Sequence, residues 1–171
     1  MQILVTAASR HGSTMEVAEV IGQALNQAGF AATVKRVRDL DGVAGYGAVV
    51  LGSAVYMGRW LPEATDFVRR HRIELGARPV WLFSSGPTGG PESRPEGEPA
   101  GIANLVASVH ALGHRTFGGR LERGRLGFGE RLVISALRAR EGDFRDQEAM
   151  KAWADEIARE LAPIAALASA G

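Results

Sequence analysis

Residues able to hold a phosphate group stand between a short apolar run and a helical pattern near the N-terminus. These six residues, Ser9, Arg10, His11, Gly12, Ser13 and Thr14, supply hydroxyl groups, a cation and closely spaced backbone N–H groups. The start of a helix favours negative charge, because its N–H groups point outward and its dipole is positive there. Ser13 and Glu16 match a capping box, which predicts that the helix starts at Ser13. Taken alone, the segment fits an ordinary strand-to-helix turn better than a binding site.

Two further segments have compositions that suit a flat aromatic ligand. The first, expected as a loop over residues 52–59, offers aromatic and apolar side chains and contains Ser53, Ala54, Val55, Tyr56, Met57 and Gly58, with Trp60 directly behind it. The second, over residues 84–90, is small and rich in backbone groups, and it contains Ser84, Ser85, Gly86, Pro87 and Thr88. Together the three segments describe a site for a ligand that carries both a phosphate group and an aromatic ring.

The elements that must position these segments alternate between strands and helices. Apolar runs predict strands at about 2–6, 33–37, 48–51, 79–83 and 114–117, and helical spacing predicts helices at about 13–28, 62–72, 100–112 and 146–168. Gly29 is a plausible C-cap, and Pro62 suits the first position of a helix. Such alternation predicts a five-stranded parallel sheet, order 2-1-3-4-5, with helices on both faces. The three segments then meet where the strand order reverses, which is where such sheets bind ligands.

The composition limits the classes of function. The 171 residues fit one domain over 1–171, and a net charge of +1 argues against a nucleic-acid binder. There is no cysteine, and His71, His110 and His114 show no ligand spacing, so no metal site is predicted. No apolar run is long enough to span a membrane and no signal peptide is seen, so we expect a cytoplasmic protein. A basic segment at 115–140 contains Arg115, Arg120, Arg123, Arg125, Arg131, Arg138 and Arg140.

The motifs resemble those of the flavodoxin superfamily, and within it the flavodoxin-domain branch of menaquinone-dependent protoporphyrinogen oxidases. SRHGST resembles that branch's phosphate loop, and GSAVYMGRW resembles its second flavin loop. Residues 62–71 are similar to the helix behind that loop, and the basic insertion at about 119–142 and the pattern 146–161 are also similar. The resemblance implies a flavodoxin-like three-layer α/β sandwich that binds FMN and oxidises protoporphyrinogen in haem biosynthesis, with a quinone as acceptor.

The resemblance also implies roles for the residues of the three segments. Ser9, Ser13 and Thr14, with the N–H groups of residues 10–14, would bond the FMN phosphate. Tyr56 would stack on or flank the isoalloxazine ring, residues 53–58 would contact its N5 and O4, and residues 84–88 would face its pyrimidine edge. Trp60 would either shield the flavin or fix the start of the following helix. His11 fits polar filler better than a proton donor.

Two other functions stay open at this point. One is a flavodoxin-type electron carrier, and the other is a flavodoxin-like binding domain that has lost FMN. The basic segment is either a solvated helix face or a docking surface for propionate-bearing tetrapyrroles, an acidic redox partner or anionic lipid heads at the inner face of the membrane. A response regulator is excluded, because Ala8-Ser9 stand where its acidic pair is needed.

Overall fold

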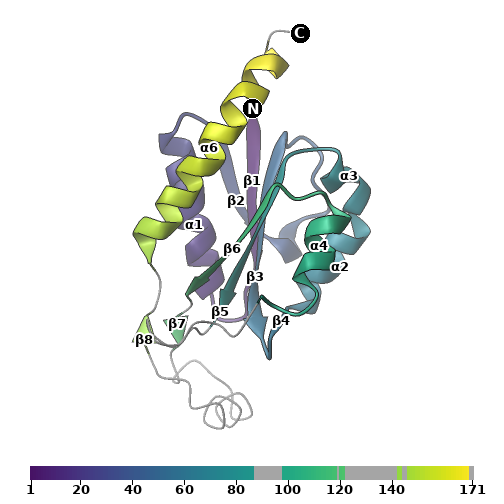
Figure 1. The fold of residues 1–171 in the computed structure, drawn as a ribbon, viewed down its shortest axis with the longest axis vertical. Coiled ribbons are helices and arrows are strands. Elements are labelled where there is room, and N and C mark those ends of the chain that lie inside the picture. The colour runs from purple at the N-terminus through teal and green to yellow at the C-terminus, as the bar shows by residue number, and fades with distance from the viewer. Residues whose placement is uncertain (87–97, 119, 122–141, 144–145, 170–171) are drawn as a thin grey trace.

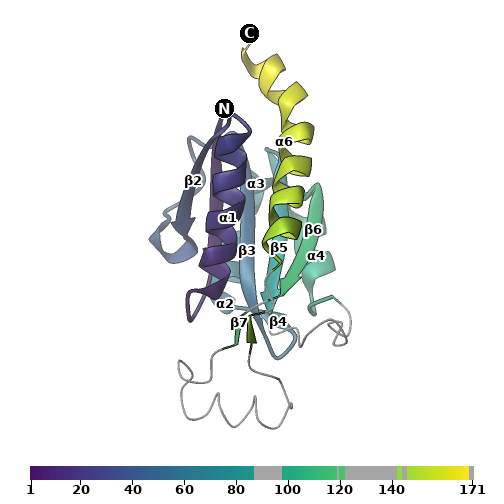
Figure 2. The ribbon, with the colours of Figure 1, turned by 90° about the vertical axis from the view of Figure 1, so that its left-hand side faces the viewer.

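The computed structural model is a three-layer α/β sandwich around one parallel sheet (Figures 1 and 2). It describes residues 1–86, 98–118, 120–121, 142–143 and 146–169. The five parallel strands are β1 (Gln2–Ala8), β2 (Ala31–Arg36), β3 (Ala48–Tyr56), β5 (Val80–Gly86) and β6 (Gly113–Gly118). Their order is β2-β1-β3-β5-β6, which is the predicted order 2-1-3-4-5 counted over the parallel strands. The predicted fold class is therefore confirmed.

Helices cover both faces of the sheet (Figure 2). One face carries α1 (Ser13–Gln27) and α6 (Gln147–Ser169), and the other carries α2 (Pro62–Arg70), α3 (Arg72–Gly76) and α4 (Ile102–Ser108). The 3₁₀ turn η1 (Val37–Asp39) follows β2, and three short strands complete the elements: β4 (Arg59–Trp60), β7 (Arg120–Leu121) and β8 (Gly142–Asp143). Most of the basic segment at 115–140 lies outside the described residues.

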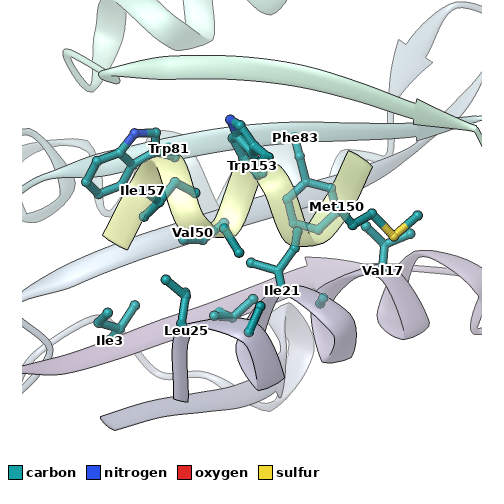
Figure 3. Close-up of a cluster of buried hydrophobic side chains, with 14 of the residues drawn as sticks. Ile3, Val17, Ile21, Leu25, Val50, Trp81, Phe83, Met150, Trp153 and Ile157 are labelled. Atoms are coloured by element: carbon teal, nitrogen blue, oxygen red, sulfur yellow. The ribbon is translucent and has the colours of Figure 1, made fainter. Parts of the chain in front are cut away.

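Alternation along the strands divides the core into two clusters. On β1, Ile3 and Val5 pack beneath α1 and α6, whereas Leu4 packs toward the other helices. Figure 3 shows the first cluster, which contains Trp81 and Phe83 of the sheet, and the ring of Phe83 meets Trp153 of α6 edge-on. Buried apolar surface on both faces of each central strand is what an all-parallel sheet requires.

Two central strands run further than the sequence predicts. The expected loop at 52–59 is wrong, because β3 continues to Tyr56 and pairs antiparallel with β4, so that Met57 and Gly58 alone form the turn. Gly52 stands inside β3 because a Cβ atom there would lie 2.1 Å from Cζ of Phe83. The expected loop at 84–90 likewise starts too early, since β5 includes Ser84, Ser85 and Gly86. The sequence analysis placed the ends of both strands where their apolar runs stop, at Leu51 and Phe83, although small residues continue each strand.

The helix ends also differ from the predictions in detail. α1 starts at Ser13 as predicted, but its N-cap is Gly12 and not Ser13, so the capping box is wrong as the reason for this start. α1 ends at Gln27 with Ala28 as its C-cap, so the predicted C-cap Gly29 stands one residue further on, with φ +92°. Asp146 caps α6, since its Oδ1 accepts the N–H of Ala149 at 3.0 Å. The predicted helix at 100–112 is shorter in the structure, because α4 ends at Ser108.

Candidate functional site

The carboxyl ends of β1, β3 and β5 form a row of small residues at one edge of the sheet. Ala8 is paired with Ser53, and Ser53 is paired with Ser84, so these three residues lie side by side across the sheet. Beyond that level, Ala54 is paired with Ser85, which is buried. The register therefore brings the three predicted segments to one edge, at the point where the strand order reverses.

The first loop is shaped by Ser9 and Gly12. The Gly12 N–H donates to Oγ of Ser9 at 3.0 Å, which closes the loop just before α1. Gly12 has φ +90°, a conformation that L side chains rarely adopt, and a Cβ atom there would meet nothing within 4 Å. Open space therefore borders the start of α1, where Thr14 is buried in the first turn. A phosphate group fits this position because of the helix dipole and the space beside Gly12.

The β3–β4 hairpin supplies the aromatic part of the site. Its two turn residues both have positive φ, 48° for Met57 and 72° for Gly58, as a type I′ turn requires. Met57 is 82% exposed, whereas Tyr56 is half-buried. The guanidinium carbon of Arg10 lies 4.9 Å from the centre of the Tyr56 ring, within cation–π distance. The first loop and the hairpin are thus in direct contact.

Trp60 belongs to the packing around this site and not to its surface. The side chain is 5% exposed, and its Nε1–H donates to Oγ of Ser84 at 2.7 Å. Next to it, Oγ of Ser53 accepts the N–H of Leu61 at 3.0 Å and donates to the carbonyl of Ala54 at 2.8 Å. Of the two roles considered for Trp60, the structure supports fixing the start of α2. The Ser53 and Ser84 hydroxyls are likewise engaged inside the protein, and backbone groups are what these two positions can offer a ligand.

The third segment is described in part. Gly86 ends β5 at the site edge, while Pro87 and Thr88 lie outside the described residues. Just before α4, the N–H of Ala100 donates to the carbonyl of Gly58 at 2.7 Å. The chain that leaves β5 therefore returns to the tip of the hairpin before α4 begins.

Two residues beside the site were missed by the sequence analysis. Nε2 of His114, on β6, lies 2.9 Å from Oγ of Ser84, and its Nδ1 lies 3.6 Å from Oε1 of Glu98. Burial lowers the pKa of His114 below the usual 6.5, and the negative charge of Glu98 raises it in part. The sequence contained one indication, since His114 lies on the predicted strand next to the one that Ser84 follows. We considered it only as a metal ligand, and its spacing excluded that role.

Other site types have no support within the described residues. No group of three or more histidine, aspartate or glutamate side chains there is placed to hold a metal ion. None of the helices described is both long enough and apolar enough to cross a membrane. Most of the basic segment falls outside these residues, although Arg115 pairs with Glu156 of α6 at 3.0 Å.

The structure is similar to solved structures of other proteins over most of the chain. A flavodoxin from the domain Archaea superposes with a TM-score of 0.62 at 17% identity, over 94% of this chain and 99% of the other. Flavodoxin 1 from Bacillus cereus gives 0.62 at 14% identity, over 95% and 100%. Rubredoxin oxygen:oxidoreductase from Desulfovibrio gigas gives 0.61 at 14%, over 94% of this chain but 36% of that one. These likenesses show the fold.

The sequence itself gives the family. No curated protein matches the sequence significantly. The model of the flavodoxin domain, in contrast, matches residues 4–148, which include the first loop, the hairpin and the ends of β5 and β6. The chain therefore belongs to the flavodoxin domain family.

Proposed function

We propose that the chain binds FMN at the carboxyl edge of its sheet and acts as an FMN-dependent oxidoreductase. The observation that carries the proposal is the contact between Arg10 and Tyr56, which joins a cation beside a helix start to an aromatic ring. A phosphate group suits the first and an isoalloxazine ring suits the second. FMN carries both groups in one molecule, and membership of the flavodoxin domain family supports the same cofactor.

The protein's contribution is to bind and orient the cofactor, which supplies the redox chemistry when bound. Residues 9–14 would hold the phosphate, with Gly12 leaving the space for it. Tyr56 and the exposed Met57 would border the ring, and the backbone from Ser53 to Gly58 and from Ser84 to Gly86 would supply hydrogen bonds. These assignments are predictions that a titration can test.

A visible absorption spectrum of the purified protein is the first test of FMN binding. Protein mixed with FMN and then desalted should keep bands at about 375 and 450 nm, the usual positions for oxidised flavin. Gly12→Asp places a carboxylate and a side chain in the space beside the helix start, and this variant should lose the bands. A colourless wild-type protein would contradict FMN binding and favour a binding domain that has lost the cofactor.

For the reaction, we propose oxidation of a protoporphyrinogen-type tetrapyrrole with a quinone as acceptor. Each step would remove two electrons and two protons from the substrate and convert the quinone to its hydroquinone. The resemblance of the first loop and the hairpin to the protoporphyrinogen oxidase branch supports this substrate. The test is the rise of porphyrin fluorescence when FMN-loaded protein is mixed, without oxygen, with porphyrinogen and a quinone. No rise above a protein-free control would contradict it.

A flavodoxin-type electron carrier is the second candidate. It is supported by two flavodoxins that share the fold of this chain and that are matched over 99% and 100% of their own lengths. A carrier accepts electrons from a flavin reductase and passes them to an acceptor such as cytochrome c. Transfer to cytochrome c without turnover of porphyrinogen would favour the carrier over the oxidase.

A further inference from the structure

A line of buried polar groups crosses the sheet beneath the proposed FMN site. It runs from Trp60 on β4 to Ser84 on β5 and His114 on β6, and it ends at Glu98, which precedes α4 (Figure 1 shows the strands). Ser84 is fully buried, and the side chain of His114 is 7% exposed. Glu98, at 68%, is in contact with water. The line therefore connects a solvated carboxylate with the inside of the β3–β4 hairpin.

The direction of each hydrogen bond in this line follows from its donors. The Trp60 indole can only donate, so Oγ of Ser84 accepts at 2.7 Å. Among the described contacts of Ser84, Nε2 of His114 at 2.9 Å is the acceptor available to the hydroxyl proton, so every group is satisfied when Nε2 is unprotonated. The neutral ring consequently carries its proton on Nδ1, on the side of Glu98.

Serine, histidine and glutamate in this order resemble a nucleophile with its base, but the surroundings exclude that role. The Ser84 side chain has no exposed surface, and its oxygen already accepts the Trp60 N–H. A substrate cannot reach a hydroxyl in this position. The network instead holds the hairpin and β6 in fixed positions relative to β5.

A second connection returns from Glu98 to the same hairpin. Two residues after Glu98, the N–H of Ala100 donates to the carbonyl of Gly58 at the hairpin turn. His114 thus faces the hairpin through Ser84 and Trp60 on one side, and through Glu98 and Ala100 on the other. A change at His114 acts on the segment that would border the flavin.

Protonation of His114 would disturb this arrangement. Both ring nitrogens would then be donors, so Oγ of Ser84 would face two donors and its own proton would lose its acceptor. A buried hydroxyl without an acceptor is unfavourable. This loss disfavours the protonated ring, and burial, which lowers the pKa of His114, disfavours it too.

The charged surroundings of His114 are few within the described residues. Glu98 is in ion-pair range, whereas Ser84 and Trp60 are neutral and α4, on the same face of the sheet, has no titratable side chain. On this face α2 also carries Glu63, Asp66, Arg69 and Arg70, and Arg59 precedes Trp60 on β4. The Arg115–Glu156 pair lies on the opposite face of β6, since successive strand residues alternate.

We propose that His114 is a proton-linked positioning residue, which holds the β3–β4 hairpin through Ser84 and Trp60 when neutral and loosens it when protonated. Its effect on the cofactor rests on the proposed binding of FMN, whereas its effect on the hairpin does not. Neutral His114 would favour tight flavin binding, and acidification would weaken it.

The first experiment needs no cofactor. Nitrogen NMR of the ¹⁵N-labelled apoprotein should show His114 at pH 8 with a proton on Nδ1 and none on Nε2. The indole N–H resonance of Trp60 should shift with the same midpoint as the His114 ring. His114→Gln keeps an amide acceptor for Ser84 but does not titrate, so the Trp60 shift should then be lost. A proton on Nε2 at pH 8, or a Trp60 resonance that titrates equally in the variant, would overturn the proposal.

The second experiment measures FMN affinity against pH. The Kd of the wild type should rise several-fold more than that of His114→Gln between pH 8 and pH 5.5. Ionisation of the FMN phosphate, with a pKa of about 6, affects both proteins alike and cancels in the ratio. Equal pH dependence in both would overturn the link to the cofactor. If neither protein binds FMN, the proposed function fails, while the NMR result still decides the role of His114.

Discussion

At the scale of single residues, Gly12 and Arg10 contribute shape and charge to the first loop. Gly12 has φ +90° beside open space, and Arg10 reaches across to the ring of Tyr56. The structure offers a match for Gly12 elsewhere in the chain. Gly29, at the other end of α1, has φ +92° and also has no atom within 4 Å of an added Cβ. The two glycines differ in their place relative to the proposed ligand.

Replacing each of these glycines with alanine separates stability from binding. A left-handed conformation costs an L residue about 1–2 kcal/mol, so Gly12→Ala and Gly29→Ala should each lower the free energy of unfolding by about that amount. Urea denaturation checks this expectation. FMN affinity, measured by quenching of flavin fluorescence, should fall for Gly12→Ala alone. Equal affinity in the two variants would remove Gly12 from the phosphate site.

Arg10 can be tested with a change of charge and a change of shape. Arg10→Ala removes the cation from the loop and from the Tyr56 ring, and a charge-assisted hydrogen bond contributes about 1.5–3 kcal/mol, so the Kd for FMN should rise at least tenfold. Arg10→Lys keeps the charge and should lose less. Riboflavin, which lacks the phosphate, should show a smaller effect of Arg10→Ala than FMN does. An equal effect on both ligands would assign Arg10 to the ring alone.

The sequence identified the residue types of the site but not which of their groups are engaged. Ser9, Ser53 and Ser84 look alike as hydroxyl donors at loop positions. In the structure, Ser9 closes its own loop, Ser53 holds the N–H of Leu61, and Ser84 receives the Trp60 indole. The partner of Ser9 is local, whereas the partners of Ser53 and Ser84 lie 8 and 24 residues away and come from the three-dimensional arrangement, which no spacing rule indicates.

At the scale of elements, the β3–β4 hairpin determines what borders the site. Because β3 continues to Tyr56, this ring belongs to a paired strand, and the exposed turn is reduced to two residues. The order of the parallel strands was predictable from their alternation with helices. The strand ends were not, because pairing with β4 and the packing of Phe83 on Gly52 are contacts between distant segments.

Trp60 provides a test of how firmly the hairpin is held. Trp60→Phe removes the N–H that Ser84 accepts, so the free energy of unfolding should fall by about 1–2 kcal/mol, the range for a lost buried hydrogen bond. Trp81→Phe is the matched control, since its N–H bonds the exposed Glu160 on the other face, where water can replace it. Urea denaturation of both variants measures the two losses in the free energy of unfolding. An equal loss in the two would show that the Ser84 bond adds nothing specific.

At the scale of the whole molecule, two clusters of buried side chains hold the helices to the sheet. Their division follows the alternation along the strands, with Trp81 and Phe83 facing α6 and Leu82 facing the opposite helices. This arrangement was predictable, since each central strand is a continuous apolar run. A buried histidine within such a fold adds a dependence of stability on pH that hydrophobic patterning does not reveal.

Stability should decrease as the pH falls, and His114 should contribute to that decrease. Its pKa is lower in the folded protein than the usual 6.5, so the unfolded chain binds the proton first. The contribution of His114 is therefore complete above about pH 6.5 and is lost as the pH falls toward the lowered value. Urea denaturation from pH 8 to pH 5 should show a smaller decrease for His114→Gln than for the wild type. Parallel curves would contradict this assignment.

The β3–β4 hairpin also has a consequence for how the chain folds. Parallel strands pair only after a long crossover has been closed, whereas a two-residue turn brings β3 and β4 together within microseconds. The Trp60 side chain would then be in place early, while its acceptor on β5 arrives only with the next crossover. We therefore expect the Trp60 indole to change its environment in two steps, first when the hairpin forms and later, when β5 joins the sheet and supplies the Ser84 acceptor.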